Sequence, residues 1–359
     1  YKADIISKAI EGVVSSSIPT TYLQLHKNTT LILDNEAASE LTRIKAPWLV
    51  ANCEWDKNLR SKAISWLCRR TGKSILKLTD KDYNDNGMSD LLALHGSSYD
   101  LNIEMFNRLQ HSITGWPGGK PNSDDKNRPE RAIPEKKRVI IFSPHPDDDV
   151  ISMGGTFDRL VSQGHEVHVA YQTSGNIAVS DQDAKRFLEV TQDILKSDQI
   201  KQIEKLNGEF ENLNPNNPTP LGICNLKGSI RKGESLGATR YIGIPDDQVH
   251  FMNLPFYETG IIDKNPPSQK DLDLTIALIE ELKPHQIYAA GDLADPHGTH
   301  RVCLNIIFNS LDALKTKSFM KDCWMWLYRG AWHEWEIHEI EMAVPMSTDQ
   351  VLRKRKAIF

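Results

Sequence analysis

The sequence predicts an α/β fold: a Rossmann-like, mainly parallel sheet with flanking helices, preceded by a small α/β N-terminal region. Two features carry this prediction. Short apolar runs such as Arg138–Ser143 recur through the second half of the chain, and segments with helical periodicity separate them. These helical segments are long enough to return the chain to the starting edge of the sheet, as parallel neighbouring strands require. We therefore expect one α/β domain over residues 137–359.

The elements of this domain follow one another in a regular order. The segment Asn207–Leu226 is rich in Asn, Pro and Gly, so we expect a long loop there, of the kind that often carries function near a ligand-binding edge. We expect strands at Arg138–Ser143, His165–Gln172, Val249–Met252 and Gln286–Gly291, and helices at Ile151–Ser162, Asp183–Ser197, Arg231–Arg240, Leu272–Leu282 and His300–Leu314.

The first part of the chain has shorter and less regular patterns. After Trp116 the composition changes, and Gly, Pro and charged residues dominate up to Lys136. Such a segment has little to bury and indicates a linker. The predicted division is a first region at residues 1–115, a linker at 116–136 and a second domain at 137–359. In the first region we expect a strand at Thr30–Leu33 and helices at Ala37–Arg43, Leu59–Cys68 and Asp90–Leu94.

The composition excludes several classes of protein. Charged residues make up 25% of the 359 residues, hydrophobic residues 39%, and the net charge of −5 offers no basic surface for nucleic acid. No apolar stretch approaches the roughly 20 residues of a membrane span, and no segment resembles a signal peptide. The five cysteines form no Cys-x-x-Cys pair, so we expect a reducing compartment, the cytoplasm. The oligomeric state stays open.

Two clusters of His and Asp each come directly after a predicted strand. The first is Ser143-Pro-His-Pro-Asp-Asp-Asp149, and the second is Asp295-Pro-His-Gly-Thr-His300. The carboxyl ends of parallel strands meet at one edge of the sheet, and in open α/β sheets ligands bind at that edge. Imidazoles and carboxylates gathered at such an edge indicate a metal-dependent hydrolase.

The residue types and their spacing fit a catalytic zinc site. Zinc accepts His nitrogen and Asp oxygen, and a catalytic site has three protein ligands and one open position. His145 and Asp148 lie three residues apart on a turn, and either His297 or His300 can complete the set. Asp147 and the remaining His are then available for acid–base chemistry. The pattern predicts a metal-bound water as the nucleophile that attacks a carbonyl.

These residues also carry a resemblance to a known family. Pro144-His-Pro-Asp-Asp148 and His297-Gly-Thr-His300 resemble the signature of the PIG-L / LmbE-like family of N-acetylglucosamine deacetylases. The resemblance covers about residues 137–355, and it implies an LmbE-like fold and removal of an N-acetyl group from an N-acetylglucosamine-type sugar. Further segments similar to the family are Gly154-Gly155-Thr156, Gly164-His-Glu-Val167, and Arg231-x-x-Glu234 before Gly243-Ile244.

The resemblance implies roles for particular residues. His145, Asp148 and His300 would be metal ligands, for Zn²⁺ or, as the alternative, Fe²⁺. Asp147 would be the general base, His297 would stabilise the oxyanion and act as general acid, and Arg231 would contact hydroxyls of a small amino-sugar substrate. The chain departs from the family at two positions. Asp149 stands where Glu is usual, and Thr299 stands where an Asp often adjusts the neighbouring His.

The N-terminal region carries a second resemblance. Glu11-Gly-Val-Val14, Tyr22–His26 and Leu31–Ala38 resemble the last strands of the glucosamine-6-phosphate deaminase/isomerase family, over about residues 1–45. This implies a fusion protein, with the phosphate-binding loop and the acid–base residues of the isomerase upstream of residue 1. The alternative function is therefore a non-catalytic sugar-binding or regulatory module of such a fusion. Isomerase activity of this chain itself would need those upstream residues.

Three further features allow two interpretations each. Asp292 and Asp295 support the ligand His residues, or they only cap a loop. The segment Pro245-Asp246-Asp247 before His250 precedes a strand, which favours a turn over a second site. A group of aromatic residues suits sugar rings, but core packing of a late strand is the favoured interpretation. These residues are Trp324, Trp326, Tyr328, Trp332 and Trp335.

Overall fold

The computed structural model describes residues 2–122, 126–194, 200–214 and 216–359, and the chain divides into two compact units. The first unit is Tyr1–Ile113 with Trp335–Ala343, and the second is Thr114–Glu334 with Val344–Phe359. Each unit has a hydrophobic core of its own.

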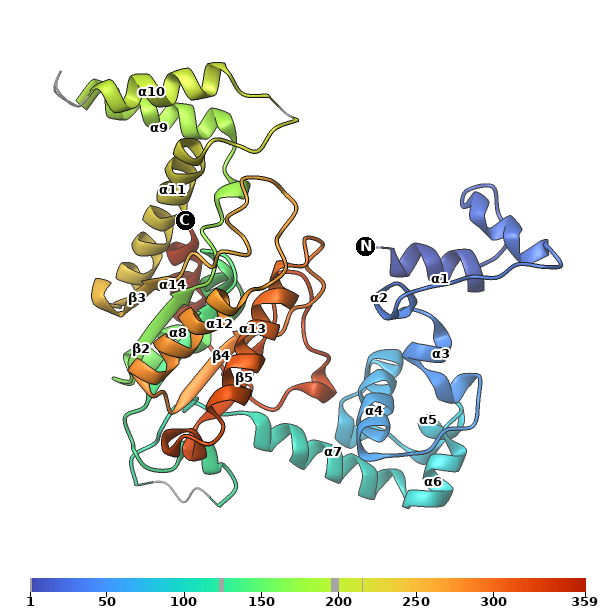
Figure 1. The fold of residues 1–359 in the computed structure, drawn as a ribbon. Helices are drawn as coiled ribbons and strands as arrows, with labels where there is room; N and C mark the ends of the chain where they lie inside the picture. The colour runs from blue at the N-terminus through green and yellow to red at the C-terminus, as the bar shows by residue number, and fades with distance from the viewer. Residues whose placement is uncertain (1, 123–125, 195–199, 215) are drawn as a thin grey trace. The chain divides into compact units, whose positions relative to one another are not determined.

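The second unit is built on a parallel sheet of five strands in the order β3-β2-β1-β4-β5 (Figure 1). β1 pairs with β2 on one side and with β4 on the other. On one side of β1 the chain therefore adds β2 and then β3. It then crosses to the other side of β1 and adds β4 and β5. This order confirms the predicted Rossmann-like sheet and creates a topological switch point between β1 and β4. The strands are β1 (Arg138–Ser143), β2 (Glu166–Tyr171), β3 (Val249–Phe251), β4 (Gln286–Ala290) and β5 (Trp324–Tyr328).

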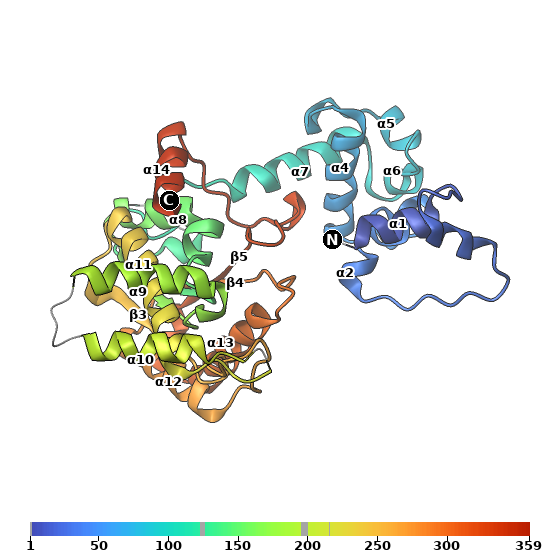
Figure 2. The ribbon, with the colours of Figure 1, turned by 90° about the horizontal axis from the view of Figure 1, so that it is seen from above.

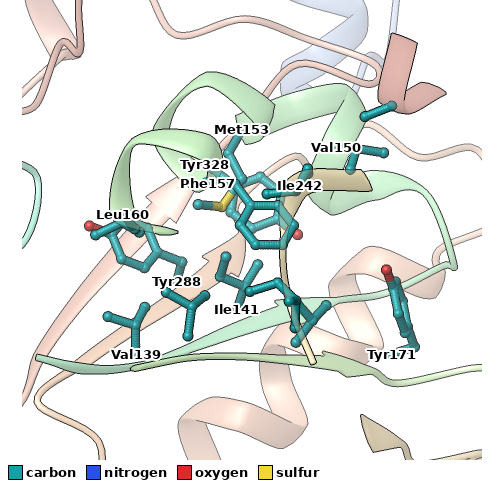
Figure 3. Close-up of a cluster of buried hydrophobic side chains, with 14 of the residues drawn as sticks. Val139, Ile141, Val150, Met153, Phe157, Leu160, Tyr171, Ile242, Tyr288 and Tyr328 are labelled. Atoms are coloured by element: carbon teal, nitrogen blue, oxygen red, sulfur yellow. The ribbon is translucent and has the colours of Figure 1, made fainter. Parts of the chain in front are cut away.

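Helices cover both faces of this sheet. On one face α8 (Asp148–Ser162), the end of α11 (Leu221–Ile242) and α14 (Thr348–Ile358) contribute to a core that includes Val139 and Ile141 of β1. On the other face α12 (Gln269–Leu282) and α13 (Thr299–Leu314) pack against Ile140 and Phe142. Figure 3 shows the first of these cores, with Phe157 and Leu160 of α8 beside the sheet. Because successive residues point to opposite covered faces, β1 is apolar without interruption from Val139 to Phe142.

The connection between β2 and β3 differs from the prediction. It contains α9 (Asp181–Ile194), α10 (Ile200–Glu211) and α11 (Figure 2). The long loop predicted at Asn207–Leu226 is therefore wrong at both ends, which are helical, and a loop remains only between α10 and α11. Leu188, Phe210 and Ile223 from these three helices are buried in one small core. This burial outweighs the loop tendency of Asn and Gly. The helix predicted at Asp183–Ser197 is confirmed as far as Ile194, and residues 195–197 lie outside the described residues.

The first unit is helical in its described residues apart from short connections and isolated bridges. Its core includes Trp48, Leu67 and Tyr83. The helices predicted at Leu59–Cys68 and Asp90–Leu94 are confirmed, whereas the helix predicted at Ala37–Arg43 is interrupted by a turn. The helices are α1 (Ala3–Glu11), α2 (Asn35–Ala38), α3 (Thr42–Lys45), α4 (Lys57–Thr71), α5 (Asp80–Asn84), α6 (Ser89–His95) and α7 (Ser98–Ser112).

The strand predicted at Thr30–Leu33 is wrong. These residues belong to no strand, and Leu31 and Ile32 are exposed. A strand needs a neighbouring strand to satisfy its backbone N–H and C=O groups. The described part of the first unit offers none.

The described helices and the cysteines bear on membrane insertion and disulfide formation. None of the described helices has both the length and the apolar character needed to cross a bilayer. All five cysteines are free thiols.

Candidate metal centre and active-site cavity

The two predicted clusters lie in the loops on either side of the switch point. The first loop joins β1 to α8, and the second joins β4 to α13. Because β1 and β4 are paired, their carboxyl ends bring the two loops together. The first loop is a tight turn in which the hydroxyl of Ser143 donates to the carbonyl of His145 at 2.6 Å and accepts from the backbone N–H of Asp149 at 3.1 Å.

His145, Asp148 and His300 form a compact group of potential metal ligands. One ligand atom from each residue lies within 4.8 Å of the others. Oδ2 of Asp148 is 3.2 Å from Nδ1 of His145 and 3.1 Å from Nε2 of His300. Burial raises the pKa of Asp148, but the two imidazoles lower it by more, so the net pKa lies well below its usual range. Asp148 is therefore an anion in this group.

The donor set fits a divalent cation. Two imidazoles and one carboxylate match the ligand types of catalytic zinc sites. His300 is only 1% exposed; its Nδ1 has no hydrogen-bond partner among the described residues, and its Nε2 lies 3.1 Å from Oδ2 of Asp148 without forming a well-aligned hydrogen bond. A buried ring nitrogen without a well-formed hydrogen bond is costly unless another group satisfies it. A metal ion bound by Nε2 would satisfy one nitrogen of this ring.

Two aspartates after β4 organise the second loop. The carboxylate of Asp295 accepts the backbone N–H of His297 at 2.9 Å and that of His300 at 3.2 Å. It therefore supports both residues through their backbone and not through their rings. Asp292 accepts the backbone N–H of His333 at 3.0 Å, so it holds a later segment of the chain.

Asp147 and Arg231 form an ion pair beside the ligand group. Nη2 of Arg231 donates to Oδ2 of Asp147 at 2.8 Å, and Nη1 contacts Glu234. Nε of Arg231 is buried and has no partner among the described residues. The start of α8 is also held against α11, because the hydroxyl of Ser235 donates to the carbonyl of Pro146 at 3.1 Å.

These side chains open into a cavity of about 490 Å³. The cavity lining contains five of the six predicted site residues, and the sixth, His300, is buried in contact with the lining residue Asp148. His297 is exposed, and no hydrogen bond of its ring to a described residue occurs. The lining residues are His145, Asp147, Asp148, Ile151, Gly175, Ile177, Ala178, Arg231, Tyr257, Ile262, Lys264, Asp295, His297, Thr299, Ala331 and Trp332.

The two departures from the family pattern have different surroundings. Asp149 is fully buried and accepts a hydrogen bond from the hydroxyl of Tyr171 at 3.0 Å. Burial raises the pKa of Asp149 to about 7, although the hydrogen bond from Tyr171 lowers it in part. Thr299 is also buried, and its hydroxyl has no hydrogen-bond partner among the residues described. Because residue 299 is a threonine, this position provides no carboxylate that could interact with the ring of His297.

Sequence reasoning missed several residues of the cavity wall. Trp326 and Tyr328 pack in the core as expected, but Trp332 lines the cavity, so the packing interpretation is wrong for this residue. Its place just after the carboxyl end of β5 is a signal that could have identified it. Tyr257 and Lys264 follow no motif, and only the folded chain brings them to the cavity.

The segment Pro245-Asp246-Asp247 before His250 is a turn, as expected. Asp246 lies in a short 3₁₀ helix and accepts a hydrogen bond from Nε of Arg240 at 2.8 Å. His250 contacts His168 of β2 at 3.0 Å between ring nitrogens. Among the described residues these side chains form no group of three potential metal ligands.

The fold and the ligand group define a Rossmann-like α/β domain with a His-Asp-His cluster at its switch point. Residues 140–311 match the family PIG-L: GlcNAc-PI de-N-acetylase, and these residues are a PIG-L family domain. The resemblance read from the motifs is thereby confirmed. Membership in this family supports a deacetylase of the LmbE type.

Curated relatives add the context of the N-terminal part. The whole chain is 54% identical to a putative glucosamine-6-phosphate deaminase-like protein of Bacteroides thetaiotaomicron, and it covers 55% of that protein. The chain thus spans about half the length of this relative. A stretch of 40 residues, 11% of the chain, is 50% identical to a glucosamine-6-phosphate deaminase of Clostridium botulinum, of which it covers 16%.

Among solved structures, the N,N'-diacetylchitobiose deacetylase of Pyrococcus horikoshii is similar to this chain with a TM-score of 0.39 and 21% sequence identity. The similarity covers 62% of this chain and 68% of that chain.

Proposed function

We propose that this chain is a metal-dependent hydrolase that removes an N-acetyl group from an N-acetylglucosamine-type sugar. The observation that carries the proposal is the convergence of His145, Asp148 and His300 beside a cavity that also presents Asp147, His297 and Arg231. Membership of residues 140–311 in the PIG-L family supports it.

His145, Asp148 and His300 would hold the metal ion, Zn²⁺ or Fe²⁺. Their nitrogen and oxygen donors support this assignment, as does the buried ring of His300, whose nitrogens form no well-aligned hydrogen bond with a described residue. A bound divalent ion would polarise a carbonyl and lower the pKa of water.

The remaining residues would handle protons and charge. Asp147, on the cavity wall, would accept a proton from the water that attacks the acetyl carbonyl. The ring of His297 would donate a hydrogen bond to the oxyanion and then a proton to the departing amine. The products are acetate and the free amino sugar. The ion pair with Arg231 keeps the Asp147 carboxylate oriented, and the guanidinium of Arg231, which lines the cavity, would contact a sugar hydroxyl.

A hexosamine suits the rest of the cavity. Ile177, Ile262 and Trp332 provide apolar and aromatic wall, on which the apolar face of a pyranose ring can lie. The Bacteroides thetaiotaomicron relative is named for a glucosamine-6-phosphate deaminase, which supports amino-sugar chemistry in a longer protein of this kind.

The test is acetate release by zinc-loaded protein from a panel of free, phosphorylated and glycosidic N-acetylglucosamines. We expect Asp147→Asn to lower kcat by about 10²–10⁴-fold, because the proton acceptor is lost. Asp246→Asn is the matched control, since Asp246 also pairs with an arginine but lies outside the cavity.

Two outcomes would contradict the proposal. Equal rates for Asp147→Asn and Asp246→Asn would refute the role of Asp147. A silent panel, with one zinc ion bound per chain, would favour the alternative of a non-catalytic sugar-binding or regulatory module.

A further inference from the structure

The cavity contains a second basic residue that the proposed reaction does not use. Among the lining residues, Arg231 and Lys264 are the basic ones. Arg231 is engaged by Asp147 and Glu234. The ammonium of Lys264 donates to the backbone carbonyl of Ile262 at 2.7 Å, and no carboxylate of the described residues lies within ion-pair distance of it. The lysine is half-buried.

The fold holds Lys264 close to the ligand group. Its ammonium lies 4.5 Å from the ring centroid of Tyr257, and that ring is 6.1 Å from the ring of His145. Lys264 and His145 therefore contact the same aromatic side chain. Both residues also line the same cavity, so a sugar whose acetyl group lies at His145 can extend its far end toward Lys264.

Nearby hydrogen bonds order the loop that carries Lys264. The carbonyl of Gly260 accepts the backbone N–H of Thr219 at 2.9 Å, and the hydroxyl of Thr259 donates to the carbonyl of Asp263 at 2.8 Å. Gly260 has φ +73°, a conformation that favours glycine. The loop is thus a shaped part of the cavity wall.

Nearby carboxylates act on the Lys264 ammonium electrostatically, but none of those described forms an ion pair with it. Partial burial lowers the pKa of Lys264, while Asp295, Asp263 and Glu258 raise it from a distance. Glu258 is itself occupied by the backbone N–H and hydroxyl of Ser174. A partly desolvated cation with no contacting anion is well suited to bind an anionic group of a ligand.

We infer that Lys264 recognises an anionic group on the sugar, so that the preferred substrate is a negatively charged N-acetylhexosamine. This inference rests on the proposed function and names its substrate class. Either a phosphate monoester or a carboxylate supplies the required chemistry. A neutral hexosamine would leave the Lys264 ammonium without an anionic partner in the cavity.

The first test compares kcat/KM for three probes with zinc-loaded protein: N-acetylglucosamine, N-acetylglucosamine 6-phosphate and N-acetylmuramic acid. We expect at least one charged probe to exceed the neutral one by about tenfold or more, mainly through KM. Preference for the phosphate or for the carboxylate identifies the source of the anion. Lys264→Met should lower the charged-to-neutral ratio by about tenfold.

Lys232→Met is the matched control. The ammonium of Lys232 also lies over an aromatic ring, at 4.9 Å from the centroid of Phe251, but this residue does not line the cavity. We expect Lys232→Met to keep the wild-type ratio. Equal kcat/KM for neutral and charged probes, or a ratio that Lys264→Met leaves unchanged, would overturn the inference while acetate release itself would uphold the proposed function.

A binding measurement separates the two proposals if no probe is turned over. Calorimetric titration would compare glucosamine 6-phosphate and inorganic phosphate with glucosamine, in wild type and in Lys264→Met. Phosphate-dependent binding that Lys264→Met weakens about tenfold or more, without acetate release, would retain the anion site and refute the hydrolase. Binding that Lys264→Met does not weaken would overturn the anion site.

Discussion

Replacing Asp295 tests whether the second loop positions a metal ligand or only caps a helix. The carboxylate is 5% exposed and accepts two backbone N–H groups, from His297 and His300, at the start of α13. Hydrogen bonds to charged groups contribute about 1.5–3 kcal/mol each, and helix caps about 0.5–2 kcal/mol. We therefore expect Asp295→Ala to lower the free energy of unfolding by about 2–4 kcal/mol.

The same substitution should also weaken zinc binding. Without the carboxylate, the backbone of His300 loses the contact that orients its ring toward Asp148, and outer-shell changes of this kind typically cost about 10- to 100-fold in metal affinity. Asp295→Asn keeps one acceptor oxygen and should lie between alanine and wild type. Urea unfolding gives the stability, and competition with a chelating dye gives the zinc affinity.

Asp56→Ala is the matched control for these measurements. Asp56 also caps a helix, α4, by accepting the backbone N–H of Leu59 at 2.7 Å, but it lies in the first unit. It should lose about 1 kcal/mol of stability and no zinc affinity. If Asp295→Ala lost stability but kept its zinc affinity within about twofold of wild type, the reasoning on ligand positioning would be refuted.

Two further predictions concern the core and the pH dependence of stability. Phe157→Ala should destabilise the second unit by about 3–5 kcal/mol, because Phe157 is fully buried against the sheet; a loss below 1 kcal/mol in urea unfolding would contradict the packing. His165 is buried, Nδ1 of its ring accepts the backbone N–H of Lys137 at 3.0 Å, and burial lowers its pKa to about 4. The folded chain then binds fewer protons than the unfolded chain, so His165 makes stability fall as pH decreases from about 6.5 toward 4. His165→Gln should reduce the difference in unfolding midpoint between pH 7 and pH 5, and an unchanged difference would show that His165 does not titrate in this way.

Local sequence patterns were sufficient to predict the first strand of the second unit, the turn that follows it and the parallel sheet. The apolar run of β1 and the turn at Ser143–Asp149 depend on residues close together in the chain, and the structure has both as predicted. The alternation of strands and helices likewise predicted the parallel sheet, because parallel neighbours require crossover connections.

Packing between distant segments decided what these patterns missed. Residues 200–211 form a helix because their apolar side chains are buried against α9 and α11, which the Asn and Gly content did not reveal. Thr30–Leu33 has strand-forming residues but no neighbouring strand in the described part of its unit. In both segments the structure depended on whether a neighbouring element was present to pack or pair with, and the local residue preferences did not decide it.

By itself, the sequence determined the class of fold, the family, and the two clusters that carry the candidate chemistry. These features are local, because a His-Pro-Asp-Asp turn after an apolar run specifies its own geometry. The spacing of the residues left open whether His297 or His300 joins Asp148, and the tertiary structure places His300 there and His297 on the cavity wall. Only the tertiary structure decided that Tyr257, Lys264 and Trp332 complete this wall. The physical reason is the strand order: placing β4 beside β1 brings together residues far apart in the chain, and no local pattern encodes that pairing.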